Sequence, residues 1–455
     1  MPEQNIIKEE SDLSMILRKL RKRDFSGNSG IAIKNSIYQF STQFTQRAGS
    51  IILTIILARI LMPELFGLYN LALATIIVFT TISEFGVGTT LITFLSKSLE
   101  RKNKNLAKSF FNHLKKIKIV LVGLSVLILL ASTHFIADIY YQKPIFLALI
   151  AGSLYIIFLG IVSFIQSTLQ AFNNFKGIFY NEIVFEISRV ILIPLAAILA
   201  LKSAMSNENI LFYIFVAFGL SYFIASIFII YFPYRKTNML AKSGQELDKR
   251  HKKEVNKFFI GASTLILSGI FFGYIDKIIL GRYVAGEFIG YYSAAFNLVG
   301  ALSAVIGFSS VLLPIFSRLK NDQLERGMKK TVRLIFLISA IAFLFTLLLS
   351  SYIILILYGS AYNPAVGMLM VYSMLILILP LTGVYSVYFM SREKPQVLTI
   401  LLVASTAINI ILNYFLVTYL LRFGDLIATY GAIIAVVISN LIYLLGMIVW
   451  RKRIK

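Results

Sequence analysis

The sequence predicts an all-α polytopic membrane protein, with about twelve transmembrane helices arranged as two six-helix lobes. Of the 455 residues, 58% are hydrophobic and only 14% are charged, whereas ordinary soluble domains carry about 25% charged residues. Because one helical crossing takes about 20 apolar residues, this composition suffices for about twelve crossings and leaves little for a soluble core. A soluble enzyme of this size is excluded. Disulfides and zinc–thiolate sites are excluded too, since the chain has no cysteine.

Long apolar runs follow one another along the chain, separated by short polar segments. We expect an N-lobe of six crossings in residues 34–232 and a C-lobe of six in residues 258–450, joined by a basic cytoplasmic linker at 233–257. Residues 1–33 form an N-terminal segment in which apolar residues at helical spacing lie beside basic ones. That pattern is typical of an interfacial helix, and a solvated tail explains it equally well. Residues 451–455 are a basic tail.

The distribution of positive charge predicts the orientation of these crossings. If twelve helices cross, 36 of the 44 lysines and arginines fall on the side of the N-terminus and six fall on the other side. Positive charge collects on the cytoplasmic side of membrane proteins, so we expect both termini in the cytoplasm and a multi-pass protein of the cytoplasmic (plasma) membrane. The net charge of +23 is then explained by topology and anionic lipids, and nucleic acid is not an expected partner.

Two segments, one from each half, are similar to each other. Residues 58–72 (ARILMPELFGLYNLA) align at an offset of 223 with residues 281–295 (GRYVAGEFIGYYSAA), and the two share Arg, Glu, Gly, Tyr and the final Ala. Duplication explains five matches in register at the same topological place. Because six crossings is an even number, the repeats have the same orientation and are related by a pseudo-two-fold axis along the membrane normal. This arrangement predicts a cavity between the lobes and transport by alternating access.

The first crossing carries polar side chains that predict part of this cavity. Gln39, Gln43 and Arg47 stand at positions i, i+4 and i+8 and therefore share one helix face. Their polar groups would be unsatisfied if that face met lipid. We expect the face to line a substrate cavity, with buried hydrogen bonding between helices as the alternative.

The fifth and eleventh crossings carry further candidates for the cavity. Glu182, Glu186 and Arg189 share one face of the fifth. Arg189 is suited to bind a phosphate while the two carboxylates hold sugar hydroxyls or a proton, and a structural lock between helices is an equally good interpretation. In the eleventh crossing, Asn409 and Asn413 also share a face, and we expect them to line the wall of the C-lobe.

Two acidic residues are candidates for ion coupling. Glu84 precedes the sequence FGVG at 85–88, whose glycines permit a bend or a break in the helix. It is a candidate for proton or cation coupling, or else a structural partner of Arg47. Asp276, beside Lys277, is the second candidate, with an interfacial pair as the alternative. The sequence predicts no catalytic residue, metal site or cofactor, and coupling to a proton or Na⁺ gradient stays open.

These segments resemble a known family. Residues 58–72 resemble the pattern ARxLxPxxFGxYxLA of polysaccharide-export flippases, and residues 84–88, 276–295 and 409–435 resemble three further elements of that family in the same order. The resemblance is to Wzx-type O-antigen flippases of the multidrug/oligosaccharidyl-lipid/polysaccharide (MOP) exporter superfamily, whose fold is shared with MATE transporters.

The resemblance implies a function and its partners. Such proteins move polyprenyl-diphosphate-linked oligosaccharides from the cytoplasmic to the outer leaflet for surface polysaccharide biosynthesis. Glycan polymerases and glycosyltransferases are the partners that it implies. Arg47 and Arg189 are the expected ligands of the diphosphate, because guanidinium forks match phosphate geometry.

Two other functions compete with a flippase. A multidrug or cation antiporter of the same fold usually carries an acidic residue in its first crossing, but no Asp or Glu occurs between residues 34 and 61. A membrane-embedded polysaccharide polymerase or glycosyltransferase would need a sizeable outer loop, and the outer loops here are short. We therefore expect a transporter and not an enzyme.

Overall fold

The computed structural model describes residues 27–237, 246–307, 312, 316, 319 and 321–454. Every regular element in this part of the chain is helical, as the composition predicts. The interfacial helix predicted near the N-terminus falls on residues 1–26, outside the described part.

The N-terminal half forms six crossings, and the second is broken. Its elements are α2 (Gly27–Glu84), α3 (Val87–Glu100), α4 (Lys104–His134), η1 (Phe135–Tyr141), α5 (Phe146–Ala171), α6 (Phe175–Lys202), α7 (Asn207–Ile229), η2 (Ile230–Tyr234) and η3 (Arg235–Thr237). Helix α2 holds the first crossing and part of the second, because it turns at Met62 (φ 58, ψ 171) just before Pro63. The second crossing breaks at Phe85 and Gly86, which have φ values of 23 and 75. The predicted break beside Glu84 is confirmed.

The C-terminal half repeats this plan. Its elements are α8 (Lys249–Tyr283), α9 (Gly286–Gly307), α11 (Asn321–Leu357), η4 (Ser360–Tyr362), α12 (Ala365–Tyr372), α13 (Met374–Ser391), α14 (Pro395–Leu420), η5 (Leu421–Phe423) and α15 (Asp425–Ile454). Two predicted segments outside the lobes are partly helical. The second part of the basic linker, from Lys249, is already helix α8, and residues 451–454 of the predicted tail form the last turn of α15.

The number of crossings agrees with the predicted twelve. Among the described residues, ten helical segments are long and apolar enough to cross a membrane. The first of them, Lys34–Glu100, contains two crossings separated by the turn at Met62. Helix α8 adds another, because its residues 258–275 contain no Asp, Glu, Lys or Arg. The protein is therefore a multi-pass membrane protein with two lobes of six crossings each.

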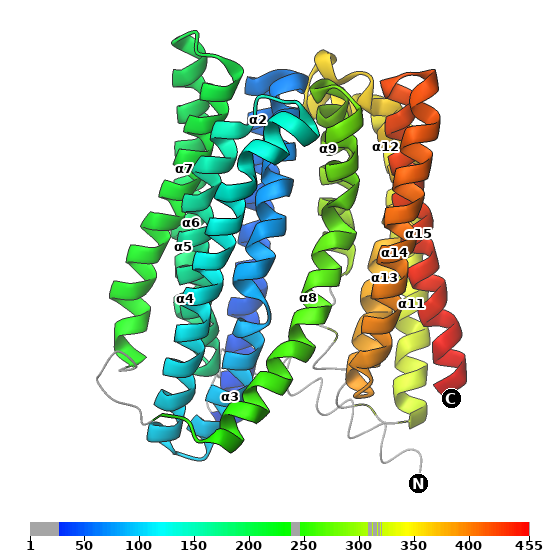
Figure 1. The fold of residues 1–455 in the computed structure, drawn as a ribbon. Helices are drawn as coiled ribbons and strands as arrows, with labels where there is room; N and C mark the ends of the chain where they lie inside the picture. Colours follow the sequence, from blue (N-terminus) through cyan, green and yellow to red (C-terminus); the bar gives the residue numbers. More distant parts are fainter. Residues whose placement is uncertain are drawn as a thin grey trace.

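The two lobes meet mainly along α2 and α9. Within the first lobe, α5 and α6 pack on α7, and α6 also packs on α2; within the second, α14 packs on α15 and α8, and α13 packs on α11 and α9. Across the lobes, α2 packs against α9 and α8, and α3 contacts α8. Figure 1 shows α2 and α9 together at the top of the molecule, with the C-terminus and the start of α8 at the bottom.

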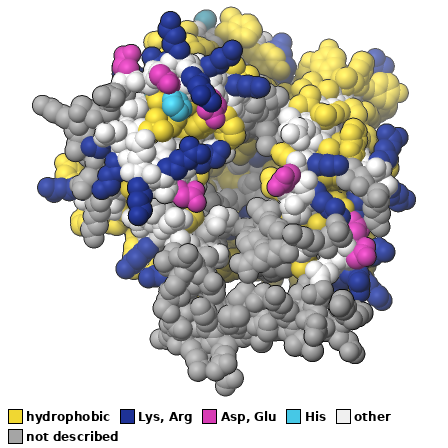
Figure 2. Space-filling model, turned by 90° about the horizontal axis from the view of Figure 1, so that it is seen from below, with side chains coloured by type: hydrophobic (Ala, Val, Ile, Leu, Met, Phe, Trp, Pro, Cys, Tyr) yellow, Lys and Arg dark blue, Asp and Glu magenta, His cyan; other side chains and the backbone are white. Residues whose placement is uncertain are grey.

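The outer surface of the helices is apolar, as a membrane requires. Helix α11 is the clearest case, because its most apolar stretch is largely exposed and presents side chains such as Ile341, Leu348 and Ile356 to the outside. Large exposed apolar surfaces mark contact with lipid or protein. Charged side chains gather on the lower face instead, where Figure 2 shows Lys and Arg distributed over both lobes.

A cavity between the two lobes

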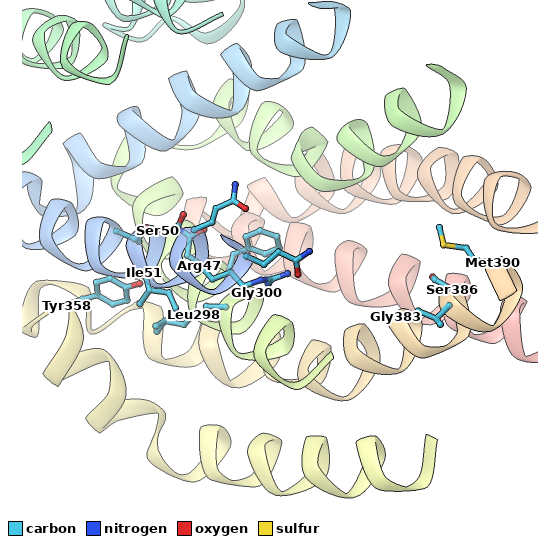
Figure 3. Close-up of a pocket in the computed structure, with 16 residues that line it drawn as sticks. Arg47, Ser50, Ile51, Leu298, Gly300, Tyr358, Gly383, Ser386 and Met390 are labelled. Atoms are coloured by element: carbon cyan, nitrogen blue, oxygen red, sulfur yellow. The ribbon is translucent and has the colours of Figure 1, made fainter. Parts of the chain in front are cut away.

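A cavity of about 860 Å³ lies between the lobes. It is lined by Gln43, Gln46, Arg47, Ser50, Ile51 and Thr54 of α2, by Phe296, Asn297, Leu298, Gly300 and Ala301 of α9, by Tyr358 just after α11, and by Gly383, Ser386, Val387 and Met390 of α13. Figure 3 shows Arg47 and Ser50 facing the α9 wall, with Ser386 and Met390 further along on α13. The volume is typical of sites that bind small molecules or headgroups.

Helical periodicity explains why these residues of α2 share the cavity wall. The lining positions from Gln43 to Thr54 follow the spacing i, i+3, i+4, i+7, i+8 and i+11, which is one face of a helix. Gln43 and Arg47 lie where the sequence predicts them. Gln39, one turn earlier, is exposed and is not part of the lining.

Arg47 is the only charged side chain in the described lining of the cavity. It is exposed, and among the described residues it has no ion-pair partner. Amides from Gln43, Gln46 and Asn297 surround it, and the described lining contains no carboxylate. A guanidinium offers five donors and no acceptor, so this cavity is suited to an anionic group flanked by polar ones.

The structure places Arg189 behind the cavity wall. Its Nε donates to Oε2 of Glu186 at 2.7 Å, and its NH2 group donates to Oγ of Ser50 at 2.6 Å. Both members of the pair are buried, with side-chain exposures of 11% and 6%. Glu182 is buried on the same face of α6. Arg189 and Glu186 therefore join α6 to α2, which is the geometry of a lock, and none of the three residues lines the described cavity.

Gly49 allows this lock to form. A Cβ atom at Gly49 would lie 1.9 Å from Oε2 of Glu186, so only glycine lets the carboxylate approach the backbone of α2 so closely. Arg189 is also held against the ring of Phe185, with its guanidinium carbon 5.1 Å from the ring centre. The lock thus fixes the α2 segment that presents Arg47 and Ser50 to the cavity.

Asn409 and Asn413 also lie away from the cavity. Both are fully buried in α14. Asn409 donates to Oγ of Ser439 in α15 at 2.9 Å, and Asn413 donates to Oδ1 of Asn409 at 2.7 Å. These amides connect two helices of the C-lobe, and the structure does not bring them to the cavity wall where the sequence predicted them.

Glu84 pairs with Lys118, which the sequence pattern does not mark as a partner. Nζ of Lys118 on α4 lies 2.7 Å from Oε1 of Glu84, and Oγ of Ser163 donates to the same oxygen at 2.7 Å. Arg47 is not its partner. Lys118 stands at the edge of an apolar run beside other lysines, a pattern that normally indicates a loop. It nevertheless lies well inside α4, with only 6% of its side chain exposed.

Asp276 and Lys277 are both buried in the C-lobe, so the interfacial alternative does not describe them. The hydroxyl of Tyr292 donates to Oδ2 of Asp276. Nζ of Lys277 lies 5.2 Å from the ring centre of Phe296, and Phe296 lines the cavity. Lys277 thus stands directly behind an aromatic residue of the lining, as Arg189 stands behind Ser50.

Most of the wall that faces α2 carries no recognisable signal in the sequence. Asn297 on α9 and Ser386 on α13 are isolated polar residues in apolar helices, which carry no periodic signal of their own. Only the pairing of the lobes shows that they face the same space as Arg47.

Comparison with known proteins identifies the family. The family model described as "Polysaccharide biosynthesis protein" matches residues 32–320, which is more than half of the chain. The chain belongs to the polysaccharide biosynthesis protein family. A search of curated proteins returned no significant match.

Several solved structures share the fold of this polysaccharide biosynthesis protein. A structure titled "Lipid II flippase MurJ, inward closed conformation" is 17% identical with a TM-score of 0.69, covering 91% of this chain and 87% of that one. An inward-facing multidrug resistance MATE transporter of the MOP superfamily is 13% identical with a TM-score of 0.68, covering 92% and 98%. A MOP superfamily transporter from Pyrococcus furiosus is 15% identical with a TM-score of 0.58, covering 93% and 95%.

At these identities the likeness shows the fold alone. The MATE/MOP-like fold implied by the sequence is confirmed, and the neighbours are transporters and a flippase, not enzymes. The shared fold does not identify the substrate of this protein, which has to be inferred from the residues that line its cavity.

Proposed function

We propose that this polysaccharide biosynthesis protein is a flippase that moves a polyprenyl-diphosphate-linked oligosaccharide across the cytoplasmic membrane by alternating access. The cavity carries the proposal, since it places one exposed guanidinium among amides and hydroxyls between two lobes. The family, and a fold shared with a structure titled as a lipid II flippase, support a lipid-linked substrate.

Each part of such a substrate has a matching surface. The diphosphate would accept hydrogen bonds from Arg47, whose planar fork suits phosphate oxygens better than an ammonium does. The sugar hydroxyls would pair with the amides of Gln43, Gln46 and Asn297. The polyprenyl chain would stay in the bilayer against the apolar outer face of the helices.

The described lining also weighs against the antiporter alternative. A cationic drug or ion would meet Arg47 without a carboxylate to balance it, and like charges in a site with low-dielectric walls repel strongly. An anionic headgroup is attracted by the same field.

The proposal includes a direction and a place in biosynthesis. The basic lower face would contact anionic lipids of the cytoplasmic leaflet, with both termini in the cytoplasm. Glycosyltransferases would supply the substrate on that side, and a glycan polymerase would use the product on the other. Coupling to an ion gradient would involve the half-buried Glu84 or the buried Asp276, although neither lies in the described cavity lining.

Cells without the gene provide the test. We expect them to accumulate lipid-linked oligosaccharide in the inner leaflet and to lose surface glycan. Wild-type protein and Arg422→Ala, which removes an exposed arginine outside the cavity, should restore the glycan, whereas Arg47→Ala should not. Normal surface glycan in the deleted cells would exclude the proposed function.

A further inference from the structure

The duplicated arginines of the two repeats make reciprocal contacts across the lobes. Arg59, at the end of the first crossing, donates from Nε to the carbonyl oxygen of Leu357 at 2.8 Å and from NH2 to that of Ile356. Arg282, at the end of the seventh, donates from NH1 to the carbonyl oxygens of Ile139 at 3.1 Å and Tyr140 at 2.6 Å. Each arginine thus binds two consecutive carbonyls of the opposite lobe.

The acceptors are equivalent as well. Leu357 ends α11, the third crossing of the C-lobe, and Tyr140 lies in η1, which ends the third crossing of the N-lobe. The last carbonyls of a helix lack partners within the helix and carry partial negative charge. A guanidinium that binds two of them satisfies these groups and compensates the helix dipole. All four contacts lie at the end of the molecule where α8 and α11 end, which we call the distal end.

Glycines draw the lobes together at the same end. A Cβ atom at Gly67 would lie 1.8 Å from the carbonyl oxygen of Gly286, and one at Gly290 would lie 2.0 Å from that of Pro63. Gly67 and Gly290 are themselves equivalent positions of the repeat. The backbones of α2 and α9 therefore touch between the two arginine contacts.

A tyrosine adds a further cross-lobe bond. The hydroxyl of Tyr362 in η4 donates to the carbonyl oxygen of Ala58 at 2.9 Å, next to Arg59. Opening the distal end requires all of these contacts to separate. The arginine bonds are the charge-assisted ones among them, and such bonds are the stronger class.

We propose that Arg59 and Arg282 are paired latches that close the distal end of the cavity, and that both must release their helix ends before the cavity opens there. The role in transport rests on the proposed function, but the latch itself is a property of the free protein. Because the arginines come from the duplicated segment, the latch is symmetric and each lobe holds the other.

The natural absence of cysteine makes the test direct. A single reporter, Asn297→Cys, is placed in the cavity wall, and intact cells are treated with a membrane-impermeant maleimide. We expect slow labelling of the reporter in the otherwise wild-type chain. Labelling should become about tenfold faster or more when Arg59→Gln and Arg282→Gln are combined, because the open state gains population. Each single variant should give an intermediate rate.

Two controls separate the latch from general damage. Arg422→Gln removes an exposed arginine that stacks on Tyr419, 5.4 Å from its ring centre, in its own lobe, and should leave the labelling rate unchanged. Arg59→Lys with Arg282→Lys keeps the charge but replaces each fork by one ammonium, so its labelling rate should fall between the wild-type and glutamine rates. If the double glutamine variant is missing from the membrane, the single and lysine variants carry the comparison.

A labelling rate that is the same in the wild-type chain and in the membrane-inserted glutamine variants would overturn the latch. The measurement needs no substrate, so it is independent of the flippase test. Faster labelling with no effect of Arg47→Ala on surface glycan would leave the latch standing and remove the proposed function.

Discussion

Arg47 is exposed in a cavity wall, so its substitution should affect binding more than folding. A hydrogen bond to a charged group contributes about 1.5–3 kcal/mol. We therefore expect Arg47→Ala to raise the dissociation constant for a soluble, short-chain polyprenyl diphosphate by about tenfold to a hundredfold, measured by calorimetry on purified protein. The dissociation constant of Arg47→Lys should fall between those of the wild-type protein and Arg47→Ala, because a lysine keeps the charge but lacks the planar fork.

Thr54→Ala is the matched control for this prediction. Thr54 lines the same helix face two turns from Arg47 but brings no charge, so its effect should stay small. Equal affinities in Arg47→Ala and the wild-type protein would remove the guanidinium from the binding site.

Substitutions in the ion pair of Glu186 and Arg189 should affect folding more than substrate binding. Because both groups are buried, Arg189→Met leaves an unpaired carboxylate and should lower the free energy of unfolding by about 3–5 kcal/mol. Glu186→Gln combined with Arg189→Met should recover much of this loss. Thermal unfolding in detergent gives the comparison.

Transport by the double variant decides between lock and substrate site. If the pair is a lock, the folded double variant should still move substrate. A variant that is as stable as wild type but inactive would show that the pair does more than hold the two helices together.

At this scale the sequence could predict Arg47 but not the environment of Arg189. A polar stripe on one helix face must avoid lipid, and this rule applies whatever surrounds the helix. Whether a buried charge faces a cavity or a neighbouring helix depends on side chains from elsewhere, here Gly49 and Ser50. Lys118 is a similar case, because its partner Glu84 is 34 residues away.

The close contact between α2 and α9 should make Gly67 sensitive to a larger side chain. Gly67→Ala places a methyl group 1.8 Å from a backbone oxygen, which α9 can relieve only by moving. We expect a loss of about 1–3 kcal/mol of stability. Gly123→Ala on α4 is the control, since nothing lies within 4 Å of its new methyl group, and it should stabilise the helix by about 0.5–1 kcal/mol.

Unfolding midpoints of the two alanine variants provide the measurement. Equal changes in the two would mean that the tight contact at Gly67 does not constrain the lobes.

The sequence predicts the helices better than their ends. The proline at 63 marks the turn between the first two crossings and the glycine at 86 marks the break in the second, because backbone geometry there is a local property. No local feature of the backbone marks the starts of α8 and α11. Both helices begin two to three turns before the apolar run that signals a crossing. The residues in those turns are largely charged, and such residues form helix as readily as loop.

At the scale of the whole molecule, the internal repeat was the most informative part of the sequence. Residues 58–72 and 281–295 predict two similar lobes, and they prove to be the segments that touch at the distal end. The repeat does not predict which side chains face each other across the cavity, since Asn297 and Ser386 come from helices without a polar stripe. That information lies in the packing of one lobe on the other.

The central claim is that the cavity between the lobes carries a diphosphate-linked sugar past Arg47. Purified protein in liposomes, loaded with a fluorescent polyprenyl-diphosphate oligosaccharide in one leaflet, tests it most directly. We predict that wild-type protein moves the probe to the other leaflet faster than protein-free liposomes do, and that Arg47→Ala does not. Equal rates with and without the wild-type protein, or equal rates for the two proteins, would contradict the account.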